Sequence, residues 1–337
     1  MANEFNNKVA ILVGVNTYEY VSPLHYARDD AMEFGSVLEK SLGFQPDNVV
    51  MIVEDTPRPP TRSKIFFSLG EIKKSKKVKD DDLLLFFFSG HGMISDEDGK
   101  DYLLPCDATA DNLEQTAVKI EDIAKELKKT GCKNIVMFID ACRDMGGKNV
   151  VSIGQEAAEA VRRAGIVTFF SCDPKQKSYE IDALKHGSFT ACILEAIAKG
   201  EGGSVSVLDS YLRKRVREVN INHKKPEQEP YAIIEPAEKG LLPIFLSAAQ
   251  PAQAIEILEE WENTLADLFN DGILDLDLFN KSVEYLTTEQ SQPNFDRDLR
   301  TNLIKRLHEK EMIVAAFVAA WRANERKTSK PKPKTTL

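Results

Sequence analysis

Cys142 and His91 are the residues whose types and positions are best suited to chemistry. Cys142 follows the apolar run 135–139 in the segment KNIVMFIDACRD, and His91 follows the apolar run 83–88 in DLLLFFFSGHG. A strand that is apolar throughout is typical of a parallel sheet whose two faces are both buried. Open α/β sheets place their chemistry at the carboxyl ends of such strands. We therefore take Cys142 as a candidate nucleophile.

A cysteine nucleophile needs a base, because an unperturbed thiol has a pKa of roughly 8.5. His91 can be that base if the two strands are neighbours, and the glycines on both sides of it allow the backbone to expose the imidazole. The backbone N–H groups of Gly92 and Cys142 are candidate donors to an oxyanion. In the alternative interpretation Cys142 is a small buried hydrophobic residue, but the flanking Asp140 and Arg143 argue against a purely apolar pocket.

The apolar periodicity predicts strands that alternate with helices as far as residue 246. Strands are predicted over 8–15, 48–53, 82–88, 101–105, 134–140, 165–172, 231–234 and 241–245, and helices over 26–42, 61–76, 120–130, 186–199 and 205–219. This alternation indicates an α/β fold with a mainly parallel sheet and helices on both faces. We expect an exposed, mobile loop over 143–157 and an exposed segment over 222–230.

The chain changes character after Ser247. Apolar residues there recur at helical spacing and no strand pattern appears, so residues 248–325 are predicted to form a helical bundle. Residues 326–337 are basic and contain prolines, which is typical of a disordered tail. The predicted organisation is thus an α/β domain over 1–247, a helical bundle that serves as an adaptor or packing module, and a tail.

Composition narrows the classes of function. The net charge of −9 argues against nucleic acid as the main partner, and the N-terminus has neither a signal-peptide pattern nor an apolar run that could span a membrane. The five cysteines are widely spaced and form no CxxC motif, which favours reduced thiols over a disulfide framework or a zinc site. We therefore expect a cytoplasmic protein that binds neither nucleic acid nor membrane.

The motifs together resemble those of the caspase-like cysteine proteases. SGHG after one hydrophobic strand and DACR after another are most similar to the metacaspase and bacterial orthocaspase branch, as are KVAILVGVNTY, LHYARDDA and HGSFTACILEAI. The resemblance covers about residues 8–246 and implies a caspase-like fold, with His91 as base and Cys142 as nucleophile.

The resemblance also implies a pocket for a basic residue of the substrate. Metacaspase-like enzymes line this pocket with an aspartate two residues before the cysteine, here Asp140, and with a second one that Asp30 matches best. Two carboxylates in a cleft favour arginine or lysine and repel acidic side chains. Asp29 is the alternative if the match is shifted by one residue, although an acid at a helix N-terminus also interacts favourably with the helix dipole.

The chain departs from the family in its acidic residues. Calcium-dependent relatives gather acids in loops after the cysteine, whereas Asp144, Asp173, Glu180 and Asp182 are scattered here. We expect no required cofactor, and calcium stays open as an activator.

The resemblance leads to two functional hypotheses. In the first, the protein is a cysteine endopeptidase that cleaves proteins or peptides after Arg or Lys, and its helical bundle recruits it to a partner protein, for example in bacterial stress or antiphage signalling. Self-cleavage is then expected at Lys148, Arg162 or Arg163. In the second, it is a catalytically weak caspase-like scaffold in assembly or signalling. Such pseudoenzymes usually lose the histidine or the cysteine, and this chain keeps both.

Overall fold

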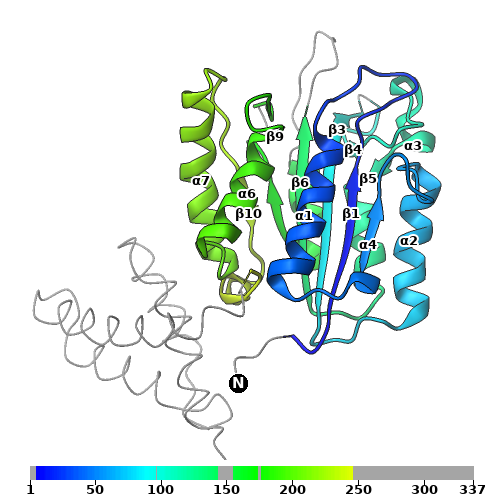
Figure 1. Ribbon diagram of the computed structural model, residues 1–337. Coiled ribbons are helices and arrows are strands. Elements are labelled where there is room, and N and C mark those ends of the chain that lie inside the picture. The colour runs from blue at the N-terminus through cyan, green and yellow to red at the C-terminus, as the bar shows by residue number, and fades with distance from the viewer. Residues whose placement is uncertain (1–4, 96, 143–154, 174–175, 246–337) are drawn as a thin grey trace, which may run out of the picture. The chain divides into compact units, whose positions relative to one another are not determined.

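A central sheet dominates the computed structural model, which describes residues 5–95, 97–142, 155–173 and 176–245 (Figure 1). Its parallel strands are β1 (Lys8–Gly14), β2 (Val49–Ile52), β3 (Leu83–Ile94), β6 (Asn134–Cys142) and β7 (Val167–Phe170). β10 (Tyr231–Ile233) pairs antiparallel with β7 at one edge, so the order across the sheet is β10-β7-β6-β3-β1-β2. The prediction of a mainly parallel sheet is confirmed.

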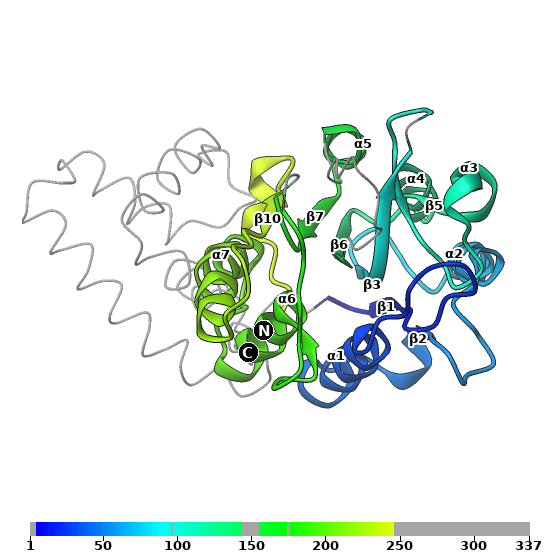
Figure 2. The same ribbon diagram turned by 90° about the horizontal axis from the view of Figure 1, so that it is seen from above.

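Helices cover both faces of this sheet. α1 (Ala27–Leu42), α6 (Ser188–Lys199) and α7 (Val205–Asn222) pack on one face, and α2 (Arg62–Ser75), α4 (Ile120–Lys128) and α5 (Gln155–Ala164) pack on the other. Figure 2 shows these two helical layers on either side of the sheet. No helix in the described ranges is both long enough and apolar enough to cross a membrane.

Successive side chains of β3 pack alternately against the helices on the two faces of the sheet. Phe87 belongs to the core under α1, whereas its neighbours Phe86 and Phe88 belong to the core under α2 and α4. Successive side chains of a strand point to opposite faces, so an apolar run buries one set of side chains in each core. The apolar strands recognised in the sequence are thus the strands at the centre of the sheet.

β3 continues beyond the predicted end at Phe88. Its extension pairs antiparallel with β4 (Asp101–Leu103), with Gly92 opposite Leu103, and β4 pairs in turn with β5 (Val118–Lys119). A short helix, α3 (Leu113–Thr116), precedes β5. The SGHG motif therefore lies inside a strand and not in the loop after it.

The remaining differences concern short elements. The predicted strand over 241–245 is wrong: a 3-10 helix, Ala237–Leu241, ends there, and only an isolated bridge joins Pro243 to Ser204. Proline has no N–H with which to continue a ladder. Residues 155–157 begin α5, although a loop was predicted there, and the rest of that predicted loop lies outside the described residues. The predicted bundle over 248–325 and the tail over 326–337 also lie outside them.

A two-stranded hairpin takes the place of the expected start of the helix over 186–199. β8 (Glu180–Ile181) pairs antiparallel with β9 (His186–Gly187), and α6 begins only at Ser188. The Glu180 carboxylate accepts the backbone N–H groups of His25 and Tyr26, at 2.9 and 2.7 Å. An acid at a helix N-terminus is stabilising, so the hairpin anchors the first turn of α1.

Candidate active site

His91 and Cys142 are direct neighbours across the two central strands. The parallel register between β3 and β6 pairs Ser89 with Asp140 and His91 with Cys142. Neighbouring strands of a sheet lie about 4.8 Å apart. Cys142, of which the structure describes the backbone, therefore ends its strand beside the histidine that was predicted to serve it.

The two ring nitrogens of His91 have different surroundings. Its Nε2 lies 2.9 Å from the carbonyl oxygen of Ser22, which can only accept, so Nε2 carries the proton and donates it. Nδ1 then carries the lone pair, and it is buried without a hydrogen-bond partner among the described residues. A neutral imidazole with an unused basic nitrogen is ready to take up a proton.

Tyr18 fixes the position of this histidine. Its hydroxyl oxygen accepts the backbone N–H of His91 at 2.8 Å, and the two rings lie 4.8 Å apart between centroids. Tyr18 and Ser22 come from the segment between β1 and α1, and the sequence analysis did not single them out. Their position just after the carboxyl end of a central strand is the signal that could have found them.

Asp30 and Asp140 form a buried acidic pair at the same edge of the sheet. Each is 1% exposed, Asp30 in the first turn of α1 and Asp140 two residues before Cys142. A methyl group placed on Gly187 would lie 2.7 Å from Oδ2 of Asp140 and 3.2 Å from Oδ2 of Asp30. Both carboxylates therefore border the same small space in front of Gly187.

Asp29 lies apart from this pair. Its side chain is half exposed and lies 3.4 Å from the guanidinium of Arg28. Of the two neighbouring acids, only Asp30 reaches the buried space beside Asp140.

The surroundings of the pair set its charge. Burial raises the pKa of Asp30 to about 7 and the charge of Asp140 adds to this rise, whereas hydrogen bonds from His186 and Ser89 oppose it. Burial likewise raises the pKa of Asp140, against hydrogen bonds from Thr190 and Ser178. Two buried like charges are costly to hold, so the pair favours a cation that enters between them.

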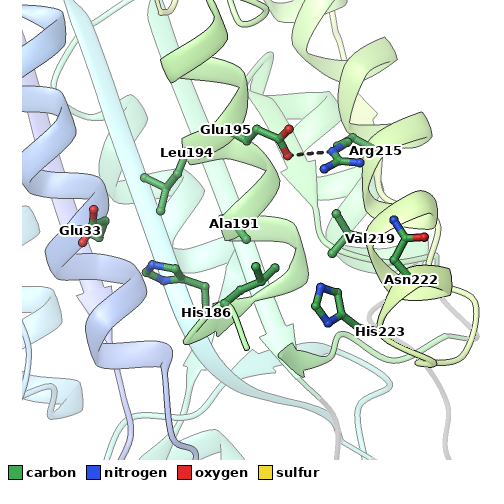
Figure 3. Close-up of a pocket in the computed structure, with 10 residues that line it drawn as sticks. Glu33, His186, Ala191, Leu194, Glu195, Arg215, Val219, Asn222 and His223 are labelled. Atoms are coloured by element: carbon green, nitrogen blue, oxygen red, sulfur yellow. Dashed lines mark hydrogen bonds and ion pairs between the residues drawn. The ribbon is translucent and has the colours of Figure 1, made fainter. Parts of the chain in front are cut away.

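His186 links Asp30 to the protein surface. Its Nδ1 lies 2.8 Å from Oδ1 of Asp30, and this bond raises the pKa of His186. The ring also borders a pocket of about 340 Å³ between α1, α6 and α7, where it lies on the side of Glu33 (Figure 3). On the far side of this pocket Arg215 donates to Glu195 at 2.8 Å. The sequence did not single out His186, because it was read as the first residue of a helix.

The other predicted residues are dispersed. Gly92 lies in the antiparallel extension of β3. Arg162 and Arg163 are exposed in the last turn of α5, where a peptide bond must unwind before a protease can bind it. Lys148 and Asp144 lie outside the described residues. Self-cleavage stays a prediction.

Two of the acids considered for calcium already accept hydrogen bonds from the segment before α1. Glu180 accepts the N–H groups before α1, and Asp182 accepts the hydroxyl of Tyr26 at 3.3 Å. The part of the chain that the structure describes holds no group of three metal-ligating side chains. Calcium activation also stays a prediction.

Comparison with known proteins identifies the family. The model of the caspase domain matches residues 7–239, which is more than half of the chain, so the chain belongs to the caspase-domain family. The chain is 32% identical to Metacaspase-3 of Arabidopsis thaliana over 95 residues, and this match covers 27% of this chain and 26% of that protein. It is 28% identical to Metacaspase-1 of Botryotinia fuckeliana over 102 residues, and this match covers 29% of this chain and 24% of that protein.

The matched regions are limited in length. The chain spans about a quarter of the length of these curated relatives. Among solved structures, caspase-1 from Spodoptera frugiperda aligns with a TM-score of 0.46 at 15% identity, over 70% of this chain and 90% of that one. The resemblance to caspase-like proteins that the motifs indicated is confirmed by the family match.

Proposed function

We propose that this protein is a cysteine endopeptidase that cuts after Arg or Lys. The observation that carries the proposal is the register of β3 and β6, which makes His91 and Cys142 direct neighbours, together with Nδ1 of His91, which has no hydrogen-bond partner among the described residues. The thiol proton of Cys142 moves to Nδ1 of His91, and the sulfur attacks the carbonyl carbon of the scissile bond. His91 then protonates the departing amine, and water hydrolyses the thioester with His91 again as base.

The acidic pair supports the choice of a basic residue on the acyl side of the cut. Asp30 and Asp140 are buried at the edge of the sheet where the proposed nucleophile lies. A guanidinium or ammonium group that enters between them lowers their mutual repulsion, and an acidic side chain increases it. Gly92 and Cys142 remain the candidate oxyanion donors.

Arginyl, lysyl and aspartyl reporter peptides test the proposal on the full chain. We expect cleavage of the first two, and Cys142→Ala should abolish it because the nucleophile is lost. Cys106→Ala is the matched control, since Cys106 is a partly exposed cysteine without a proposed role. Activity that survives Cys142→Ala contradicts the mechanism, and faster cleavage of aspartyl reporters contradicts the pocket.

The roles of calcium and of the bundle are arms of the same assay. We propose that the bundle over 248–325 recruits the peptidase to a partner protein in stress or antiphage signalling; no cofactor is required, and calcium stays open as an activator. Activity that appears with added calcium and is lost when a chelator is added would support activation by calcium. A chain that ends at residue 247 and keeps its activity on reporters while losing its partner supports recruitment by the bundle.

A further inference from the structure

Gln228 is buried directly behind the acidic pair, although the polar segment 222–230 predicted an exposed position. Its side chain is 0% exposed. Nε2 donates to the carbonyl oxygen of Ser171 at 2.7 Å and to the hydroxyl oxygen of Ser178 at 3.2 Å. Oε1 accepts from the hydroxyl of Ser188 at 2.8 Å and from Nδ2 of Asn220 at 3.1 Å. All four hydrogen-bonding positions of the amide are therefore used.

These partners fix the orientation of the amide. The carbonyl oxygen of Ser171 can only accept and the amide nitrogen of Asn220 can only donate, so Nε2 and Oε1 of Gln228 cannot exchange places. An N–H group of Gln228 consequently points at the Ser178 oxygen, and the single hydroxyl proton of Ser178 is left for another acceptor.

That acceptor is Asp140. The Ser178 hydroxyl donates to Oδ1 of Asp140 at 2.7 Å, and Oδ2 accepts from the hydroxyl of Thr190 at 2.7 Å. A directional chain thus runs from the amide of Gln228 through Ser178 to the carboxylate. Hydrogen bonds in such a chain polarise and strengthen one another.

We propose that Gln228 is a positioning residue of the basic-residue pocket, which directs the Ser178 hydroxyl onto Asp140 and so fixes that carboxylate for a substrate cation. This inference rests on the proposed function, because it assigns Gln228 to the same pocket. Gln228 acts through Ser178 and does not itself touch the substrate.

The ionisable neighbours of Asp140 show why such support matters. Asp30 faces it from α1, with His186 of β9 bonded to that carboxyl, and Cys192 of α6 lies near enough for Asp140 to raise its pKa. Burial already favours the protonated form of Asp140, and the charge of Asp140 in turn raises the pKa of Asp30. The donors from Ser178 and Thr190 oppose the effect of burial on Asp140.

Gln228→Glu is the informative change, because it keeps the shape but removes the N–H groups. A carboxylate at this position competes with Asp140 for the Ser178 proton and adds a negative charge. Ser178→Ala removes both the hydrogen bond from Gln228 and the direct hydrogen bond to Asp140, and the double variant completes a cycle. Gln176→Glu is the matched control: it makes the same charge change in the same region, and its side-chain oxygen still accepts the N–H of Glu229.

Two readouts on the full chain separate positioning from general damage. The first is kcat/KM for an arginyl reporter against pH. The second is the titration of the Asp140 carboxyl carbon by NMR in chain labelled with carbon-13 aspartate, assigned with Asp140→Asn. Alkylation of Cys142 by iodoacetamide reports the nucleophile without using the pocket.

We expect Gln228→Glu to raise the titration midpoint of Asp140 by about one pH unit and to lower kcat/KM at pH 7 about tenfold, with alkylation of Cys142 unchanged. Ser178→Ala should also raise the midpoint, and Gln228→Glu should raise it by less in the Ser178→Ala chain than in the wild-type chain, because only the direct effect of the added charge remains. Gln176→Glu should leave both values unchanged.

The inference is overturned if the Asp140 midpoint does not move in Ser178→Ala, or if Gln228→Glu shifts it equally with and without Ser178. If Gln228→Glu does not fold, an Asp140 midpoint that stays unmoved in Ser178→Ala still overturns the inference. A wild-type chain that cleaves no arginyl reporter contradicts the proposed function instead, while the NMR titration still tests the connection between Gln228 and Asp140.

Discussion

The role proposed for Asp30 in binding a substrate cation carries an energetic cost. Its carboxyl is 1% exposed and accepts hydrogen bonds from Ser89, His186 and Gly187, yet its pKa is raised from 3.8 to about 7. The folded chain therefore holds a proton on Asp30 at pH values where the unfolded chain has released it. Residues placed for function often carry such a cost.

The sign of this shift predicts how stability depends on pH. The contribution of Asp30 is present below pH 3.8 and is lost as pH rises toward about 7. The raised pKa of His186 acts in the same direction, because its contribution is also lost as pH rises through that pKa. We expect the free energy of unfolding to fall between pH 5 and pH 8, by roughly 2 kcal/mol for Asp30. Asp30→Asn should flatten this dependence in urea unfolding and abolish arginyl cleavage.

Asp29→Asn is the control for this prediction. Asp29 is adjacent in the sequence but half exposed beside Arg28, and it contributes least to the raised pKa of His186, so its substitution should change the slope of stability against pH much less than Asp30→Asn does. If Asp30→Asn keeps the wild-type slope, the buried acid is not the origin of the dependence.

At the scale of elements, the β8–β9 hairpin forms a wall of the acidic pocket. Gly187 has φ −61° and ψ 141°, which any residue adopts, so Gly187→Ala tests the space and not the backbone. Its methyl group would lie 2.7 Å from Oδ2 of Asp140. We expect kcat/KM for arginyl reporters to fall about 100-fold, because the carboxylate is displaced.

Gly70→Ala is the matched substitution elsewhere. Gly70 lies within α2 with nothing within 4 Å of the added methyl, so alanine should leave activity intact and raise stability by roughly 0.5–1 kcal/mol. Alkylation of Cys142 should be unaffected in both variants. Full arginyl activity in Gly187→Ala would show that the pocket lies elsewhere.

Some elements of the fold could be predicted from the sequence and others could not. The apolar runs that end near His91 and Cys142 predicted parallel strands, because a strand buried on both faces needs apolar side chains at every position. That these two strands are neighbours was a condition for the dyad, which the register of β3 and β6 meets. The β8–β9 hairpin has only two residues in each strand, too few to show a period, so His186 and Gly187 were assigned to a helix. Gln228 was missed for another reason: three of its four hydrogen-bond partners are 40 or more residues away in the sequence, and no local pattern records them.

At the scale of the whole molecule, the net charge of −9 acts together with the buried pair. A negatively charged protein attracts cationic peptides over distances set by the ionic strength, with a Debye length of about 30 Å at 0.01 M and about 8 Å at 0.15 M. The buried carboxylates are screened much less, since water and ions do not surround them. Salt should therefore weaken the encounter with an arginyl peptide more than the chemistry that follows binding.

We expect kcat/KM for an arginyl reporter to fall by a factor of about two to five between 0.01 M and 0.15 M salt, with kcat nearly constant. Stopped or continuous assays at constant pH measure both values, and alkylation of Cys142 by uncharged iodoacetamide provides the control that salt should not change. A kcat that falls in parallel with kcat/KM would place the salt-sensitive charges in the pocket itself. Such a result would mean that Asp30 and Asp140 are more open to solvent during turnover than their 1% exposure in the free protein indicates.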